Sequence, residues 1–192
     1  MKTKLLLMLP LICFSTLNAQ DNLPYYEIPE YPSEYNECTV VARMIDGLGF
    51  RFYWATEGLR AEDLAFKPSE KGRTTEETID HIVGLTNFVY NSALKRANQS
   101  LDLEGKTFEE KRAITLSMLK EISDIFRSCD DLSKFKIVFK RGDQTNELPF
   151  WNQINGPIAD ALWHVGQVVT HRRTSGNPFN SKVSVFTGTV RQ

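Results

Sequence analysis

Four segments of this chain place apolar residues three and four positions apart, which is the spacing of an amphipathic helix that packs into a core. The four apolar stripes are Cys38, Val41, Ile45, Leu48 and Phe52; Ile82, Leu85 and Val89; Met118, Ile122, Ile125 and Cys129; and Ile158, Leu162, Val165 and Val169. Little sequence between them has the alternation of a strand. The pattern therefore predicts an all-α fold, a four-helix bundle.

Two of the predicted helices carry a clear start signal. Thr74 with Glu77, and Thr107 with Glu110, form the Thr-x-x-Glu capping box, in which each side chain binds the free backbone N–H of the other residue. These pairs predict that the second helix begins at Thr74 and runs to about Asn98, and that the third begins at Thr107. Residues 60–73 between the first two helices are predicted to be a loop.

The first helix is predicted to start after Ser33 as its N-cap and to stop near Gly58. Gly47 and Gly49 lie inside it, where glycine costs stability, so they indicate a close contact or a kink.

The fourth helix is predicted to begin at Asn155-Gly156-Pro157 and to stop at Gly176. Residues 135–150 alternate apolar and charged side chains on either side of Gly142 and Asp143, which predicts a short β-hairpin or extended excursion between the third and fourth helices.

The N-terminus has the three parts of a secretory signal: basic residues up to Lys4, an apolar run from Leu5 to Phe14, and a small residue at Ala19. The run is too short to span a bilayer, which needs about 20 apolar residues. We therefore expect cleavage near Ala19 and a periplasmic or secreted mature chain that does not insert into the membrane. The predicted order is a signal peptide (1–19), an extended arm (20–34), the bundle (35–177) and a C-terminal tail (178–192).

The charge distribution indicates which classes of binding partner to expect, and the cysteine content bears on the cellular compartment. The 23 basic and 24 acidic residues are scattered, so no nucleic-acid or anionic-membrane partner is indicated. After signal removal only Cys38 and Cys129 remain, in an oxidising compartment. A disulfide between them and two buried thiols are both compatible with these residues.

The fourth helix also carries a polar stripe of Asp160, His164, Gln167 and His171. Such a stripe is either the solvent-exposed face of the helix or the lining of an internal pocket. Asp160 and His164 lie one turn apart and can close on one cation, with a third ligand from another helix. His171 lies about 10 Å further along the axis and is predicted to be a surface or helix-end histidine.

Aromatic and basic residues near this stripe suggest a substrate pocket. Trp151, in the segment leading into the fourth helix, is the favoured pocket residue, whereas Trp163 is expected to be ordinary core or lid packing. Arg172 and Arg173 could hold a substrate carboxylate, but arginines in a last helical turn also serve the helix dipole.

Three motifs, EDLAFKP (62–68), TTEETIDH (74–81) and above all DALWHVGQVVTHRRTSG (160–176), give residues 35–177 a resemblance to the DinB/YfiT-like family. The resemblance implies a four-helix bundle in up-down-down-up order that holds a divalent metal (zinc, nickel, iron or manganese). Its ligands would be His81, His164 and, where that family usually has histidine, Asp160, a competent ligand. The same helix order would bring Cys38 and Cys129 to one end, which favours the disulfide.

The resemblance leaves two functional hypotheses. The first is an exported metal-dependent hydrolase or transferase with a small-molecule substrate, in which Gln167 supports a ligand or the substrate. The second is a non-catalytic periplasmic binding or interaction bundle with a degenerate metal site. The resemblance allows a monomer or a homodimer.

Overall fold

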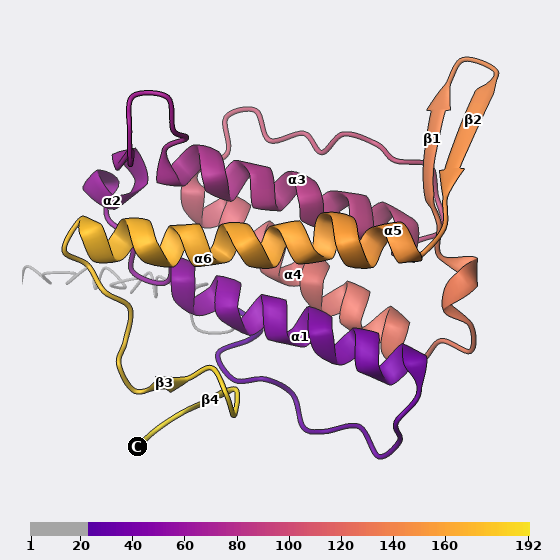
Figure 1. Cartoon of the computed structure of the whole chain (residues 1–192), viewed down its shortest axis with the longest axis horizontal. Coiled ribbons are helices and arrows are strands. Elements are labelled where there is room, and N and C mark those ends of the chain that lie inside the picture. The colour runs from indigo at the N-terminus through magenta and orange to yellow at the C-terminus, as the bar shows by residue number, and fades with distance from the viewer. Residues whose placement is uncertain (1–22) are drawn as a thin grey trace, which may run out of the picture.

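The computed structural model describes residues 23–192, and the expected signal peptide lies outside them. The described chain is mainly helical (Figure 1). Its helices are α1 (Glu37–Thr56), α2 (Ala61–Ala65), α3 (Thr75–Ala93), α4 (Phe108–Arg127), a 3-10 turn (Leu132–Lys134), α5 (Trp151–Gln153), a π-helical turn (Ile154–Ile158) and α6 (Ala159–Thr174). Its strands are β1 (Ile137–Arg141), β2 (Gln144–Leu148), β3 (Val183–Ser184) and β4 (Thr189–Val190).

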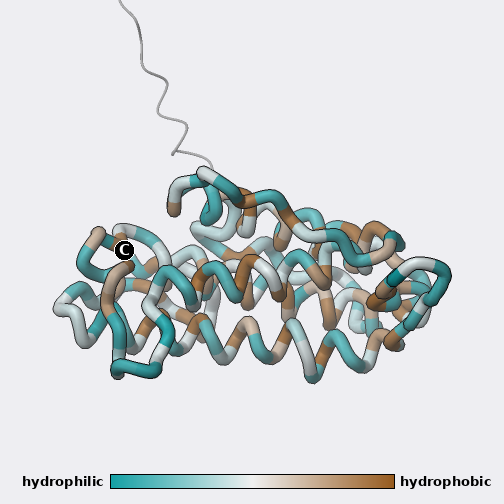
Figure 2. The backbone as a smooth tube through the Cα atoms, turned by 90° about the horizontal axis from the view of Figure 1, so that it is seen from above, coloured by the Kyte–Doolittle hydropathy of each residue, from teal (hydrophilic) through white to brown (hydrophobic). Residues whose placement is uncertain are grey.

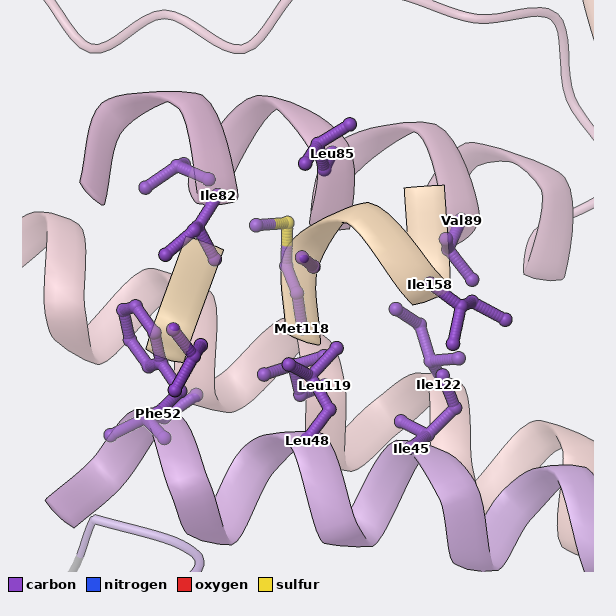
Figure 3. Packing of buried hydrophobic residues seen from close by; sticks show 14 of the residues in the cluster. Ile45, Leu48, Phe52, Ile82, Leu85, Val89, Met118, Leu119, Ile122 and Ile158 are labelled. Atoms are coloured by element: carbon purple, nitrogen blue, oxygen red, sulfur yellow. The ribbon is translucent and has the colours of Figure 1, made fainter. Parts of the chain in front are cut away.

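The four long helices share one apolar core. α1 packs against α4 and α6, and α3 packs against the same two helices. Figure 1 shows that α1 and α6 run in one direction and α3 and α4 in the other. Side chains from different helices meet in the core; those labelled in Figure 3 are Ile45, Leu48, Phe52, Ile82, Leu85, Val89, Met118, Leu119, Ile122 and Ile158.

The predicted apolar stripes are therefore the buried faces of the helices. Brown and teal residues alternate along each helix in Figure 2, as expected for amphipathic segments with one face in the core and the other in water. Both Thr-x-x-Glu pairs form reciprocal capping boxes, with Thr74 and Thr107 as the N-caps. The prediction for α1 is wrong by three residues, because Asn36 rather than Ser33 is the cap and pairs with Thr39.

Three further boundaries differ from the predictions. The predicted loop 60–73 contains the short helix α2, and α3 ends at Ala93, five residues before Asn98. Lys95 follows with a φ of 53°, a left-handed conformation that ends the helix. A short helical segment that begins at Trp151 precedes the predicted start, and non-helical torsion angles at Gly156 (φ −98°, ψ −113°) mark a kink between it and the helix that continues from Pro157.

The predicted hairpin and disulfide are both present. β1 and β2 pair in antiparallel register around Gly142, whose φ of 57° suits the two-residue turn. Cys38, in the first turn of α1, is bonded to Cys129, just after α4, across a Cα–Cα distance of 5.8 Å. Because α1 starts where α4 ends, the bond joins two helices at the same end of the molecule (Figure 1).

The arm that precedes α1 is anchored in the core by Tyr25. This side chain is 4% exposed, and its hydroxyl donates to Asp46 Oδ1 at 3.2 Å. Burial, followed by the nearby Asp46 carboxylate, raises the pKa of Tyr25 well above its usual range. Gly49 provides the space, since a Cβ there would lie 2.4 Å from the Tyr25 ring. The close contact suggested by the glycines is thus made with the arm.

Replacing Gly49 by alanine should therefore destabilise the fold, although alanine is the better helix former. The new Cβ would push Tyr25 out of its site, and we expect a loss of about 1 to 3 kcal/mol. Gly84→Ala in α3 is the matched control, because its Cβ would meet nothing within 4 Å. That variant should gain up to about 1 kcal/mol. Urea unfolding of both variants measures the difference, and a stabilising Gly49→Ala would contradict this role of Tyr25.

The C-terminal tail packs beside the arm. Ile28 N–H donates to the Gly188 carbonyl at 2.9 Å, and Val183 lies in a small apolar cluster with Phe50 and Trp54 of α1. Arm and tail together cover part of α1. Within residues 23–192, no helix is long and apolar enough to cross a membrane.

Candidate metal centre

Three of the predicted site residues meet between α3 and α6. Asp160 Oδ2 lies 3.4 Å from His81 Nε2, and Asp160 Oδ1 lies 3.3 Å from His164 Nε2. The two imidazole rings meet edge to face, with centroids 4.6 Å apart. One potential ligand atom from each residue lies within 4.8 Å of the others. The structure therefore brings together the three residues that the family resemblance implied.

Helix geometry explains this arrangement. Asp160 and His164 are one turn apart in α6, so their side chains leave the same face. His81 lies in α3 beside the buried Ile82, at the edge of the face that packs on α6. All three side chains are partly buried: 34% of His81, 38% of Asp160 and 13% of His164 remain exposed to solvent. The cluster is thus held by two packed helices but remains open on one side.

Gln167 fixes the orientation of one imidazole. Its Oε1 lies 2.8 Å from His164 Nδ1. Because an amide oxygen accepts hydrogen bonds, this contact places a proton on Nδ1 and leaves Nε2 as the ring atom that can bind a metal. This is the tautomer that a metal ligand needs, and such supporting hydrogen bonds are common around metal sites.

The spacing of the cluster fits a small divalent ion. Ligand atoms bound to tetrahedral zinc at about 2.1 Å lie about 3.4 Å from one another. The two histidine–aspartate separations of 3.4 and 3.3 Å, one to each oxygen of Asp160, are close to this spacing. A set of one ligand atom per residue lies within 4.8 Å, so side-chain rotations of about 1 Å would bring the three atoms onto one ion. Two imidazoles and one carboxylate form a donor set that suits zinc, iron, nickel or manganese. The residues present therefore fit such an ion.

His171 lies in the last turn of α6, as the helix-end alternative predicted, but it is buried, so the surface alternative is wrong. The ring is 6% exposed, packs on Phe66 with centroids 5.4 Å apart, and its Nδ1 lies 3.2 Å from the Thr75 hydroxyl. Burial lowers the pKa of His171, because the charged ring would lose water. The polar stripe of α6 thus faces α3, and only its first two residues, Asp160 and His164, belong to the cluster.

The remaining predicted site residues lie elsewhere. Trp151 begins α5 and is 76% exposed, so its assignment to a substrate pocket stays a prediction. Trp163 is 72% exposed, which contradicts the expectation of core packing: α6 turns this position away from both neighbouring helices. Arg173 lines a groove between α1 and α6.

Two buried charged residues have roles that sequence reasoning missed. Arg172 is 3% exposed, and its Nη1 donates to the carbonyls of Trp54, Ala55 and Glu57 at the end of α1. It therefore caps a neighbouring helix instead of holding a substrate. No signal in the neighbouring sequence distinguishes the buried Arg172 from Arg173 beside it, so its role could not be predicted.

Asp63 of α2 is fully buried and ties α2 to the segment after α6. The guanidinium of Arg60 and the donors Ser175 Oγ and Asn177 Nδ2 all bind its carboxylate. These hydrogen bonds, led by that of Arg60, hold the pKa of Asp63 well below its usual range. The motifs EDLAFKP and RTSG, 112 residues apart from Asp63 to Ser175, are therefore joined by one carboxylate.

Comparison of the chain with family models, with curated proteins and with solved structures finds no match.

Proposed function

We propose that this protein is an exported, metal-dependent hydrolase or transferase of the DinB-like type that acts on a small-molecule substrate. The observation that carries the proposal is the convergence of His81, Asp160 and His164, with ligand atoms within 4.8 Å of one another. Gln167, which orients His164, supports it further. These residues come from the motifs on which the family resemblance rests.

The fold part of the proposal is a four-helix bundle in up-down-down-up order. The shared directions of α1 with α6 and of α3 with α4 support this order (Figure 1). The pairwise packing of α1 and α3 on both α4 and α6 supports a single bundle core.

Three protein ligands leave coordination positions free, and a divalent ion held in this way supplies a Lewis acid at the open side of the cluster. The chain's own residues prepare the site. Asp160 faces both histidines, so its negative charge offsets part of the charge of the ion. The partial exposure of His81 and Asp160 provides an approach for a small substrate from solvent.

The disulfide supports export. Structural disulfides persist in oxidising compartments and are rare in the cytosol. The Cys38–Cys129 bond is thus in keeping with the secretory signal in residues 1–19 and with a periplasmic or secreted location.

Metal analysis of protein purified without a histidine tag tests the proposal. After dialysis against zinc, nickel, iron or manganese and removal of free ion, the wild-type chain should retain about one divalent ion. His164→Ala and His81→Ala should each retain almost none, because two ligands hold an ion far less tightly than three. An assay against a panel of esters, amides and phosphoesters then tests the proposed enzyme activity. Hydrolysis should depend on the metal and should be lost in His164→Ala.

His171→Gln is the matched control, since it removes the third histidine of the mature chain without touching the cluster. It should bind metal like the wild type. Circular dichroism confirms that each variant is folded. A wild-type chain that retains none of the four ions would overturn the metal site and favour the non-catalytic binding bundle.

A further inference from the structure

A groove of about 490 Å³ runs between α1 and α6, closed at one side by the C-terminal tail. Its wall is mostly apolar: Trp54 from α1, Leu162, Val165 and Val169 from α6, and Phe179 and Val185 from the tail. The volume lies in the range of small-molecule sites. In Figure 1, α1 and α6 lie side by side, and the chain after α6 passes along the end of α1.

The groove is on a different side of α6 from the metal cluster. Leu162, Gly166 and Val169 line the groove, whereas Asp160 and His164 face α3. With about 100° between successive residues of a helix, these two sets leave α6 on roughly opposite faces. The groove is therefore separate from the cluster, and an inference about it does not depend on the proposed function.

Two arginines give this apolar groove a positive charge. Arg51 reaches it from α1 and Arg173 from α6. Arg51 donates to the carbonyls of Gly47 and Val185, and Arg173 stacks over the Phe179 ring at 5.5 Å. Among residues 23–192, neither guanidinium forms an ion pair with a carboxylate. Each retains N–H donors that can bind an anion.

Two carboxylates near the end of α1 are paired with other arginines. Glu57, near the end of α1, pairs with Arg112, and Asp63 pairs with Arg60. The two groove arginines are thus not neutralised by their surroundings. An apolar wall beside two unpaired guanidinium groups is complementary to an apolar body that carries one negative group.

We propose that this groove binds a small apolar monocarboxylate, with the chain or ring of the ligand on the half-buried Leu162 and Val169 and its carboxylate between Arg51 and Arg173. Arginine suits a carboxylate because its planar fork can donate two parallel hydrogen bonds. Burial of the apolar part of the ligand supplies the affinity, and the two arginine charges select a ligand that carries a carboxylate.

Titration calorimetry with decanoate, and with decanol as its uncharged analogue, tests the proposal at concentrations below micelle formation. Decanoate should bind with one molecule per chain, at least tenfold more tightly than decanol. Arg51→Gln and Arg173→Gln should each weaken decanoate binding at least fivefold and leave decanol binding unchanged. No decanoate binding, or equal affinity for both probes, would overturn the proposal.

Two glycines provide a matched pair for locating the site. Gly166 lines the groove and Gly84 lies on α3, and a Cβ at either would meet nothing within 4 Å. Gly166→Leu should fold and block decanoate, whereas Gly84→Leu should fold and bind it like the wild type. Unchanged binding in Gly166→Leu would place decanoate elsewhere and overturn the groove as its site.

Discussion

Loss of the Cys38–Cys129 disulfide should lower the free energy of unfolding by about 4 to 5 kcal/mol. The bond joins residues 91 positions apart, so it excludes a large part of the unfolded ensemble. For a loop of this length, the chain-entropy relation gives about 4.6 kcal/mol at 25 °C. A loss of this size is a large fraction of the stability of an ordinary domain, about 5 to 15 kcal/mol.

Urea unfolding of the oxidised chain and of the Cys38→Ser/Cys129→Ser variant measures this contribution. Adding a reductant should bring the wild type close to the variant, while the same reductant should leave the variant itself unchanged. A difference below about 1 kcal/mol would mean that the unfolded chain is not constrained by the bond, contrary to the argument from loop length.

Removing Arg127 should have the second large effect, because it would leave a buried charge without its partner. Asp46 in α1 is fully buried, and the Arg127 guanidinium of α4 binds its Oδ2. Ser123 Oγ donates to Oδ1 at 2.6 Å and Tyr25 to the same oxygen at 3.2 Å. Breaking a buried pair in this way costs about 3 to 5 kcal/mol. We expect Arg127→Met to lose that amount.

The same helix offers the control. Lys120 and Asp124 form an exposed pair on α4, with 42% and 54% of their side chains accessible. Lys120→Met should cost no more than about 0.5 kcal/mol, since exposed pairs contribute little. Adding Asp46→Asn to Arg127→Met should recover at least half of the loss, because the unpaired charge is then removed. Equal effects of Arg127→Met and Lys120→Met would show that Asp46 does not depend on Arg127.

Local signals predicted the helical elements well. The predicted capping boxes at Thr74 and Thr107 are confirmed, because each depends only on residues three positions apart. The boundaries failed where a different local signal applied. Asn36, not Ser33, caps α1, and a short helical segment from Trp151 precedes the kink at Gly156, after which the long helix starts at Pro157 as predicted.

The candidate site was predictable in part. Asp160 and His164 share a face of α6 by spacing alone, and Gln167 follows from the same spacing. His81 lies 79 residues from Asp160, and only the family resemblance implied it. The burial of His171 was not predictable, because Phe66 and Thr75, which cover it, are distant in the sequence.

The sequence by itself determined the helical segments, most of their ends and the hairpin, because backbone hydrogen bonds and apolar periodicity act within a few residues. Tertiary structure alone decided which polar side chains became buried and with what partners. Asp46, Asp63 and Arg172 resemble ordinary surface charges in the sequence. Their burial depends on how α1, α2, α4 and α6 dock, and a buried charge is stable only where that docking supplies its hydrogen bonds.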